Sequence, residues 1–121
     1  MKVIIDLIED IRESIANAEV YELRAGLLKT DPEDSSRLGY AGEAPLNAYT
    51  MDKEARKLRF EINGSSERIS VGDLMPELLI LDMDAMMYEI RLDINAEYQD
   101  MEIVGFGKNE EQAAYLLFVA V

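Results

Sequence analysis

Residues 2–18, KVIIDLIEDIRESIANA, carry the clearest periodic pattern in the chain. The apolar residues recur at spacings of three and four, which places them on one face of a helix. They are Ile4, Leu7, Ile8, Ile11, Ile15 and Ala18. The opposite face is polar and holds Asp6, Asp10, Glu13 and Asn17. We predict an amphipathic helix over 2–18 that packs on the protein's own sheet, because a membrane-surface helix would need a basic polar face and this one is acidic.

Downstream of this helix, apolar and polar residues alternate, which is typical of strands with one wet face. The best example is 86–95, in which the apolar positions are Tyr88, Ile90, Leu92 and Ile94. The same pattern predicts further strands at 20–27, 58–62, 69–71, 101–104 and 114–121. The turn formers Asn63-Gly64-Ser65-Ser66 predict that the second and third of these strands form a hairpin.

Three shorter segments are interpreted as breaks between strands. Residues 78–81 are all apolar and fit a buried strand or one turn of buried helix equally well. The apolar face changes side near Met86, which predicts a tight turn or a bulge there. The sequence Gly105-Phe106-Gly107-Lys108-Asn109 predicts a turn.

One helix followed by several strands favours the α+β class. We expect an N-terminal amphipathic helix packed on a single, mainly antiparallel sheet of about five to six strands. A parallel α/β fold is the weaker alternative, because no further helical patterns alternate with the strands. The length of 121 residues fits a single domain, 1–121, whose β-rich region spans 57–121.

Residues 30–52 lack a sustained period and contain several turn formers, namely Asp31-Pro32, Gly39, Gly42 and Pro45. They predict one long loop. Loops of this length are uncommon in compact domains and are often functional, so the loop is a candidate binding element, with plain disorder as an equal alternative. Its candidate binding residues are Arg37, Tyr40 and Tyr49.

Charge excludes several classes of function. The chain has 25 acidic and 12 basic residues, no histidine and a net charge of −13. Nucleic-acid binding needs lysine and arginine on the phosphates, so a DNA or RNA partner is not expected. Acidic residues Asp6, Glu9 and Asp10 interrupt any signal-peptide core, and no apolar run is long enough to span a bilayer. With no cysteine either, we expect a cytoplasmic protein with no membrane association.

The chemistry-bearing residues are carboxylates. The absence of histidine and cysteine removes the usual nucleophile pairs and zinc ligands, so we predict no catalytic residue, metal or cofactor. Asp82 and Asp84 would share one face of a strand, where they could hold a hard cation such as magnesium. In so acidic a chain, solvation of an outer face is the simpler interpretation. Both residues are retained as candidate binding residues.

Seven methionines are many for this length, and Met83, Met86 and Met87 cluster beside Tyr88. Flexible methionine side chains form permissive binding surfaces, but they also fill gaps in cores. We favour the core interpretation, because a strand that changes face leaves irregular gaps to fill.

The distribution of charge indicates the function. Residues 53–72 form a basic island with a balance of +2, whereas 73–121 have a balance of −9. We therefore predict a protein-binding or regulatory module that recognises a basic partner. Small acidic bacterial proteins that shield a partner have this size and charge, although no motif carries that likeness. The alternatives are a carboxylate-dependent enzyme acting on a small molecule and a structural homodimer.

The last strand, 114–121, is the reason to expect a homodimer. Tyr115, Leu117 and Val119 point to one face, and Leu116 and Phe118 to the other. A single helix covers only one face of a sheet, so we expect a second copy to cover the other. The basic island could also pair with the acidic surface of that second copy.

Overall fold

The periodic N-terminal segment forms helix α1, Ile4–Ser14, in the computed structural model, which describes residues 1–34 and 36–121. Ile4, Leu7, Ile8 and Ile11 are buried, which confirms the predicted apolar face. The Asp6 carboxylate accepts the Val3 backbone N–H at 2.9 Å and fixes the start of the helix. The helix is shorter than 2–18, because the backbone at Ile15 is extended and a 3-10 turn, η1, Ala18–Val20, follows.

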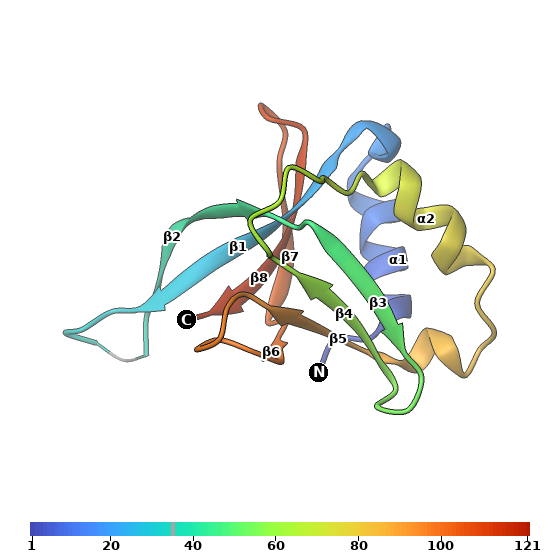
Figure 1. The fold of residues 1–121 in the computed structure, drawn as a ribbon. Coiled ribbons are helices and arrows are strands. Elements are labelled where there is room, and N and C mark those ends of the chain that lie inside the picture. The colour runs from blue at the N-terminus through green and yellow to red at the C-terminus, as the bar shows by residue number, and fades with distance from the viewer. Residues whose placement is uncertain (35) are drawn as a thin grey trace.

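The structure belongs to the α+β class, but its strands form two mixed sheets instead of one (Figure 1). The strands of the first sheet are, in spatial order, β2 Leu38–Pro45, β1 Glu22–Thr30, β8 Ala114–Ala120 and β7 Gly105–Asn109. Those of the second are β3 Ala48–Asp52, β4 Lys57–Glu61, β5 Glu89–Asp93 and β6 Met101–Glu102. We call them sheet I and sheet II.

Each sheet consists of two antiparallel hairpins whose inner strands pair in parallel. In sheet I the inner strands are β1 and β8, and in sheet II they are β4 and β5. The single antiparallel sheet that the sequence favours is therefore wrong. Alternation shows that a strand has one wet face, but it does not show which strands are neighbours.

A second helix, α2, Val71–Leu79, connects β4 to β5 and makes their parallel pairing possible. The Ser70 hydroxyl accepts the Asp73 N–H at 3.1 Å and caps the helix. Val71, Leu74 and Leu78 are buried. The predicted strand at 69–71 and its hairpin with 58–62 are therefore wrong, and the undecided run 78–81 begins as the end of this helix.

Two other predicted segments differ from the structure. The expected long loop, 30–52, is mostly strand, because β2 and β3 occupy 38–45 and 48–52. The expected turn at 105–109 is strand β7. The change of face near Met86 is a 3-10 turn, η2, Ala85–Met87, directly before β5. Turn-forming residues in this chain thus lie inside edge strands as well as between strands.

The core lies between the two sheets and the helices. Tyr115, Leu117 and Val119 share one face of β8, as predicted, and this face is turned to the core together with the inner faces of β4 and β5. Figure 1 shows α1 and α2 side by side at one end of the molecule, while the β1–β2 hairpin extends away at the other. No helix in the described ranges is both long and apolar enough to cross a bilayer.

The outer face of β8 is largely filled by the chain itself. The Phe118 ring lies flat across two glycines of the neighbouring strands, since a Cβ on Gly26 or Gly107 would approach the ring to 2.4 and 2.6 Å. Leu116 is only 5% exposed. Beside it, Arg24 forms ion pairs at 3.1 Å with Glu22 and Glu43. The apolar area that would call for a second copy on this face is therefore small.

Candidate functional site

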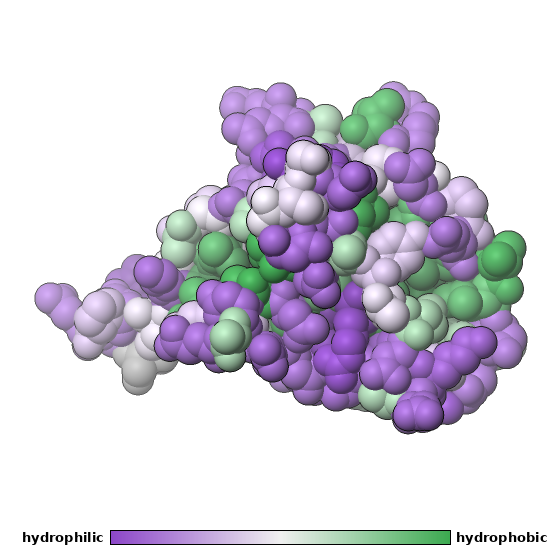
Figure 2. Space-filling view, in the orientation of Figure 1, coloured by the Kyte–Doolittle hydropathy of each residue, from purple (hydrophilic) through white to green (hydrophobic). Residues whose placement is uncertain are grey.

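Exposed apolar side chains gather in the segment that follows α2. In the described residues, nine large apolar side chains are exposed, and four of them lie between 79 and 87. They are Leu79, Ile80, Met83 and Met87. We call these four residues the methionine surface. Figure 2 shows hydrophobic residues at the edge of the molecule where α2 ends. Soluble monomers rarely leave a contiguous apolar patch open, so this surface is a candidate binding site.

The core interpretation of the methionine cluster is wrong for two of its three members. Met83 is 85% exposed and Met87 is 58% exposed, whereas Met86 is partly buried against the core. Met83 lies in the connection before the 3-10 turn η2, and within η2 the side chains of Ala85 and Met86 face the core while that of Met87 does not. The two exposed methionines are adaptable apolar contacts on the surface.

An apolar groove continues this surface between α1 and α2. Its volume is about 460 Å³. The residues that line it come from the end of α1, from η1 and from α2: Ile11, Arg12, Ile15, Ala16, Ala18, Glu19, Val71, Gly72, Met75, Pro76 and Leu79. Leu79 belongs to both features, so the groove and the methionine surface meet at this residue. We call the two together the docking surface.

Gly72 sets the width of the groove. A Cβ at this position would lie 2.8 Å from the backbone oxygen of Glu19. The N-terminal turn of α2 can therefore approach η1 closely only because residue 72 has no side chain. This contact holds the two walls of the groove at a fixed separation.

Acidic residues lie on the elements that form the docking surface, and Glu19 lines the groove itself, whereas Glu77 is turned toward Tyr49 of β3. Glu19, Asp73, Glu77 and Asp82 lie on or beside the elements that form it, and none of them makes an ion pair within the described chain. The cation inside the groove is Arg12. An apolar region with an acidic border is suited to a ligand that is apolar on one side and basic around it.

A bidentate ion pair holds η2 in place. Arg56 donates to both carboxylate oxygens of Asp84 at 2.8 and 2.9 Å, and its guanidinium lies 5.0 Å from the Tyr88 ring centre. The hydrogen bonds from Arg56 lower the pKa of the Asp84 carboxyl. Arg56 lies in the turn between β3 and β4, so the pair ties the methionine surface to sheet II.

The structure separates the two aspartates that the sequence places on one strand face. Asp82 accepts the Ala85 N–H at 2.8 Å and begins η2, whereas Asp84 points to Arg56. The predicted shared face is wrong, because 80–84 is a connection and not a strand. Within the described ranges, no group of three or more acidic side chains is arranged to hold a metal ion.

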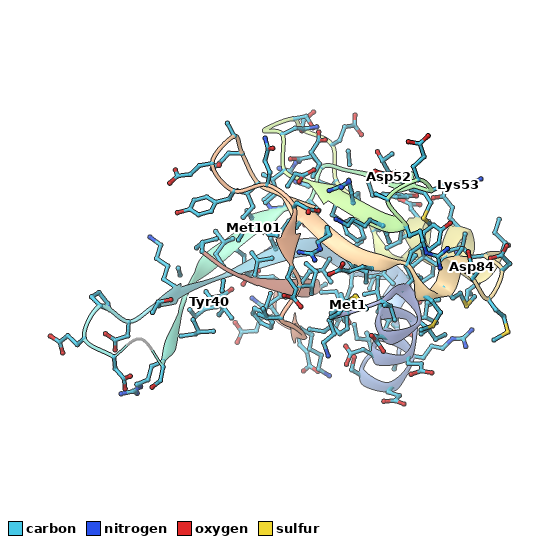
Figure 3. All side chains as sticks on the ribbon, turned by 90° about the horizontal axis from the view of Figure 1, so that it is seen from below. Met1, Tyr40, Asp52, Lys53, Asp84 and Met101 are labelled. Carbon is cyan, nitrogen blue, oxygen red and sulfur yellow. The ribbon has the colours of Figure 1, made fainter. Side chains whose placement is uncertain are left out.

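The other predicted binding residues lie in two places. Tyr49 is on β3, packs on Phe60 with ring centres 6.0 Å apart, and donates its hydroxyl to Glu77 of α2, next to the docking surface. Arg37 and Tyr40 belong to the distant β1–β2 hairpin. Figure 3 shows Tyr40 at one end of the molecule and Asp84 at the other. The structure therefore brings Tyr49, Asp82 and Asp84 to one side and leaves Arg37 and Tyr40 apart.

The basic island of 53–72 is mostly paired within the chain. Lys57 and Arg59 contact Asp100 at 3.1 and 2.7 Å on the outer face of sheet II, and Arg68 contacts Glu22 at 3.2 Å. With Arg56 held by Asp84, the island does not present free cations to a second copy, apart from Lys53. This pairing leaves the unpaired acids as the dominant charge around the docking surface.

Sequence reasoning missed the groove, although a signal for it exists. Val71, Leu74 and Leu78 recur at helical spacing behind Ser70, which is a helix N-cap pattern. On that helix Met75 and Leu79 lie on the face beside the buried one, so they extend the apolar stripe beyond what a core needs.

Comparison of the chain with protein-family models, with curated proteins and with solved structures finds no match.

Proposed function

We propose that this protein is a protein-binding module that holds a basic amphipathic helix of its partner on the docking surface. The observation that carries the proposal is the concentration of four exposed apolar side chains in nine residues, next to an apolar groove that has Glu19 in its lining. A groove between two helices is suited to a third helix, which inserts apolar residues at spacings of three and four.

The two properties of the surface have separate roles. Burial of apolar area supplies most of the affinity, at roughly 25 cal/mol per Å². The acids Glu19, Asp73 and Asp82 attract lysine and arginine at the edges of the helix and repel acidic segments. Methionine side chains adapt to different apolar partners, so the surface tolerates variation in the bound sequence.

The carboxylate-dependent enzyme is not proposed as a second function. That alternative depends on Asp82 and Asp84 sharing a face, and the structure uses them for separate structural contacts.

A synthetic amphipathic peptide tests the proposal. The probe has leucines at helical spacing and lysines elsewhere, and its binding is followed by fluorescence anisotropy. We expect Met83→Lys to weaken binding by about tenfold or more, which corresponds to about 1.4 kcal/mol. The matched control is Val104→Lys. It also replaces an exposed apolar residue by lysine and changes the net charge by the same amount, but Val104 lies away from the docking surface.

A second peptide checks the role of charge. In it, glutamates replace the lysines, and we expect no binding because both molecules are acidic. Equal binding of the two peptides, or an equal effect of Met83→Lys and Val104→Lys, would overturn the proposal.

A further inference from the structure

Strand β2 has a free edge. It pairs with β1 alone, and no backbone hydrogen bond of Leu38–Pro45 in the described structure goes to any other strand. It is also the longest of the four edge strands. Figure 1 shows that the β1–β2 hairpin extends away from the rest of the molecule, so another chain can reach this edge without contacting the two helices.

The hydrogen bonds of the hairpin show which backbone groups point outward. The Asp31 N–H donates to the Arg37 carbonyl at 2.9 Å, so these opposite residues form a hydrogen-bonded pair. Such pairs alternate along an antiparallel ladder, so Leu38 and Tyr40 occupy non-hydrogen-bonded positions. Leu28, the residue of β1 opposite Tyr40, agrees with this assignment. Its carbonyl accepts the Val121 N–H on the other side of β1, so it does not point to β2. Leu38 and Tyr40 therefore direct their N–H and C=O groups to the free edge.

The same two residues carry exposed apolar side chains. Leu38 is 49% exposed and Tyr40 is 57% exposed, and they lie on one face with Gly39 between them. Native edge strands are usually protected by charged residues, and the only charged residue of β2, Glu43, is held by Arg24 and Tyr40. A register shift between Tyr40 and Gly42 confines the regular edge to the first residues of the strand.

We propose that two copies of this chain pair antiparallel through the β2 edge, with Gly39 on the twofold axis. Leu38 of each copy then lies opposite Tyr40 of the other, and each such pair exchanges both of its backbone hydrogen bonds. The side chains of Leu38 and Tyr40 pack against each other at both ends of the contact.

A second copy fits this edge better than a basic partner does. An antiparallel pair of identical edges is isologous, because residue 38 of each copy meets residue 40 of the other and two apolar side chains are matched at both ends. The contact segment Leu38–Ala41 has no charge, and the adjacent Arg37 is a cation, which repels a basic segment. Because the hairpin extends from the body, the two acidic bodies stay apart. This inference does not depend on the proposed function, since it uses a different surface.

A cysteine at the axis tests the register. The chain contains no cysteine, so Gly39→Cys introduces a single thiol. A Cβ at residue 39 meets nothing closer than the Lys29 oxygen at 3.9 Å, so the variant keeps the fold. Across the axis the two Cα atoms would lie about 4.5 Å apart, within the range of a disulfide. We expect rapid oxidation to a covalent dimer, and slow oxidation of the exposed control Val104→Cys. Equal rates would overturn the proposal.

The mass of the unmodified protein is the second test. Light scattering at about 200 μM chain should give a dimer, and a concentration this high is used because an edge contact of a few residues is weak. Leu38→Lys puts a charge on the edge and should give a folded monomer, while Val104→Lys should remain dimeric. A monomeric wild type at this concentration, or a dimeric Leu38→Lys, would overturn the proposal.

Discussion

Among the described residues, three other than glycine have a left-handed backbone, and each directly precedes a strand. They are Arg56 before β4, Asp100 before β6 and Ala113 before β8, with φ of 56°, 54° and 49°. Each ends the turn of a hairpin, where a left-handed residue aligns the two strands. Arg56 and Asp100 also take part in ion pairs, whereas Ala113 has no side-chain interaction to offset the strain.

Ala113→Gly should therefore stabilise the protein. Glycine adopts the left-handed region without strain. The strain energy that is removed exceeds the additional conformational entropy that glycine loses on folding, so the free energy of unfolding should rise by up to about 1 kcal/mol. Urea unfolding measures it. The control is Ala96→Gly, because Ala96 does not have a positive φ and should lose stability. Equal effects of the two variants would contradict the explanation.

Glu43 gives a prediction about pH. The hydrogen bond from Tyr40 at 2.6 Å, assisted by Asn109 and Arg24, holds the pKa of the Glu43 carboxyl below its ordinary value of 4.5, against the opposing effect of burial. A lowered folded-state pKa stabilises the protein above pH 4.5, and this stabilisation is lost as the pH falls through the folded-state pKa. Tyr40→Phe should raise the pKa of Glu43 and lower stability at neutral pH.

NMR titration of the Glu43 carboxyl checks this change, and unfolding curves at several pH values check the stability. The difference in stability between wild type and Tyr40→Phe should shrink as the pH falls below the ordinary pKa of Glu43. Tyr98→Phe is the control, because the Tyr98 hydroxyl makes no hydrogen bond within the described residues. An unchanged pKa in Tyr40→Phe would refute the role of its hydroxyl.

At the scale of elements, strands with alternating faces were predictable, whereas β2 and β7, which each contain two glycines, were not. Alternation located β1, β4 and β5, and a continuous apolar run located β8, whose residues 114–117 are all buried. Strand β7 was interpreted as a turn, because Gly105 and Gly107 are turn formers. Gly107 makes room for Phe118 of the adjacent strand, a contact between residues about ten positions apart that no local pattern records.

The connection between α1 and β8 depends on one buried hydroxyl. Tyr115 is fully buried and donates to the Asp10 carboxylate at 2.5 Å. Burial raises the pKa of the Tyr115 hydroxyl, so it remains the donor. Tyr115→Phe should cost about 1–2 kcal/mol of stability, because the bond is to a charged group but Asp10 is partly exposed and can be hydrated.

Asp10→Ala should cost more than Tyr115→Phe, since it leaves a buried hydroxyl without an acceptor. Asp10→Asn keeps an acceptor and should cost less than either. Urea unfolding of the three variants gives this order directly. If Asp10→Ala were the mildest of the three, the hydrogen bond would not connect the helix to the sheet.

At the scale of the whole molecule, composition leads to the proposal of a basic partner, but it does not indicate the surface that we propose for its binding. The net charge of −13 follows from counting, whereas the pairing of Arg56, Lys57 and Arg59 with distant aspartates depends on the fold. The docking surface likewise combines the end of α1 with a helix about sixty residues later. Two of the candidate residues lie near the docking surface: Asp82 is beside it, and Asp84 holds η2 in place through Arg56. The apolar residues that form the docking surface were assigned to the core.

Salt should affect the two proposed surfaces in opposite directions. Exposed charges interact over about 10 Å at 0.1 M salt and over about 3 Å at 1 M. The acidic border attracts a basic helix through such charges, so raising the salt from about 0.05 M to about 0.5 M should weaken binding of the lysine–leucine peptide.

The β2 edge has no charged contact, and two copies that each carry −13 repel one another. The same salt should therefore strengthen the dimer, and Leu38→Lys should abolish this gain without changing peptide binding. Anisotropy and sedimentation on one preparation measure both effects. If salt weakened the dimer as it weakens peptide binding, the second copy would be held by the acidic surface, and the β2 edge would not be its contact.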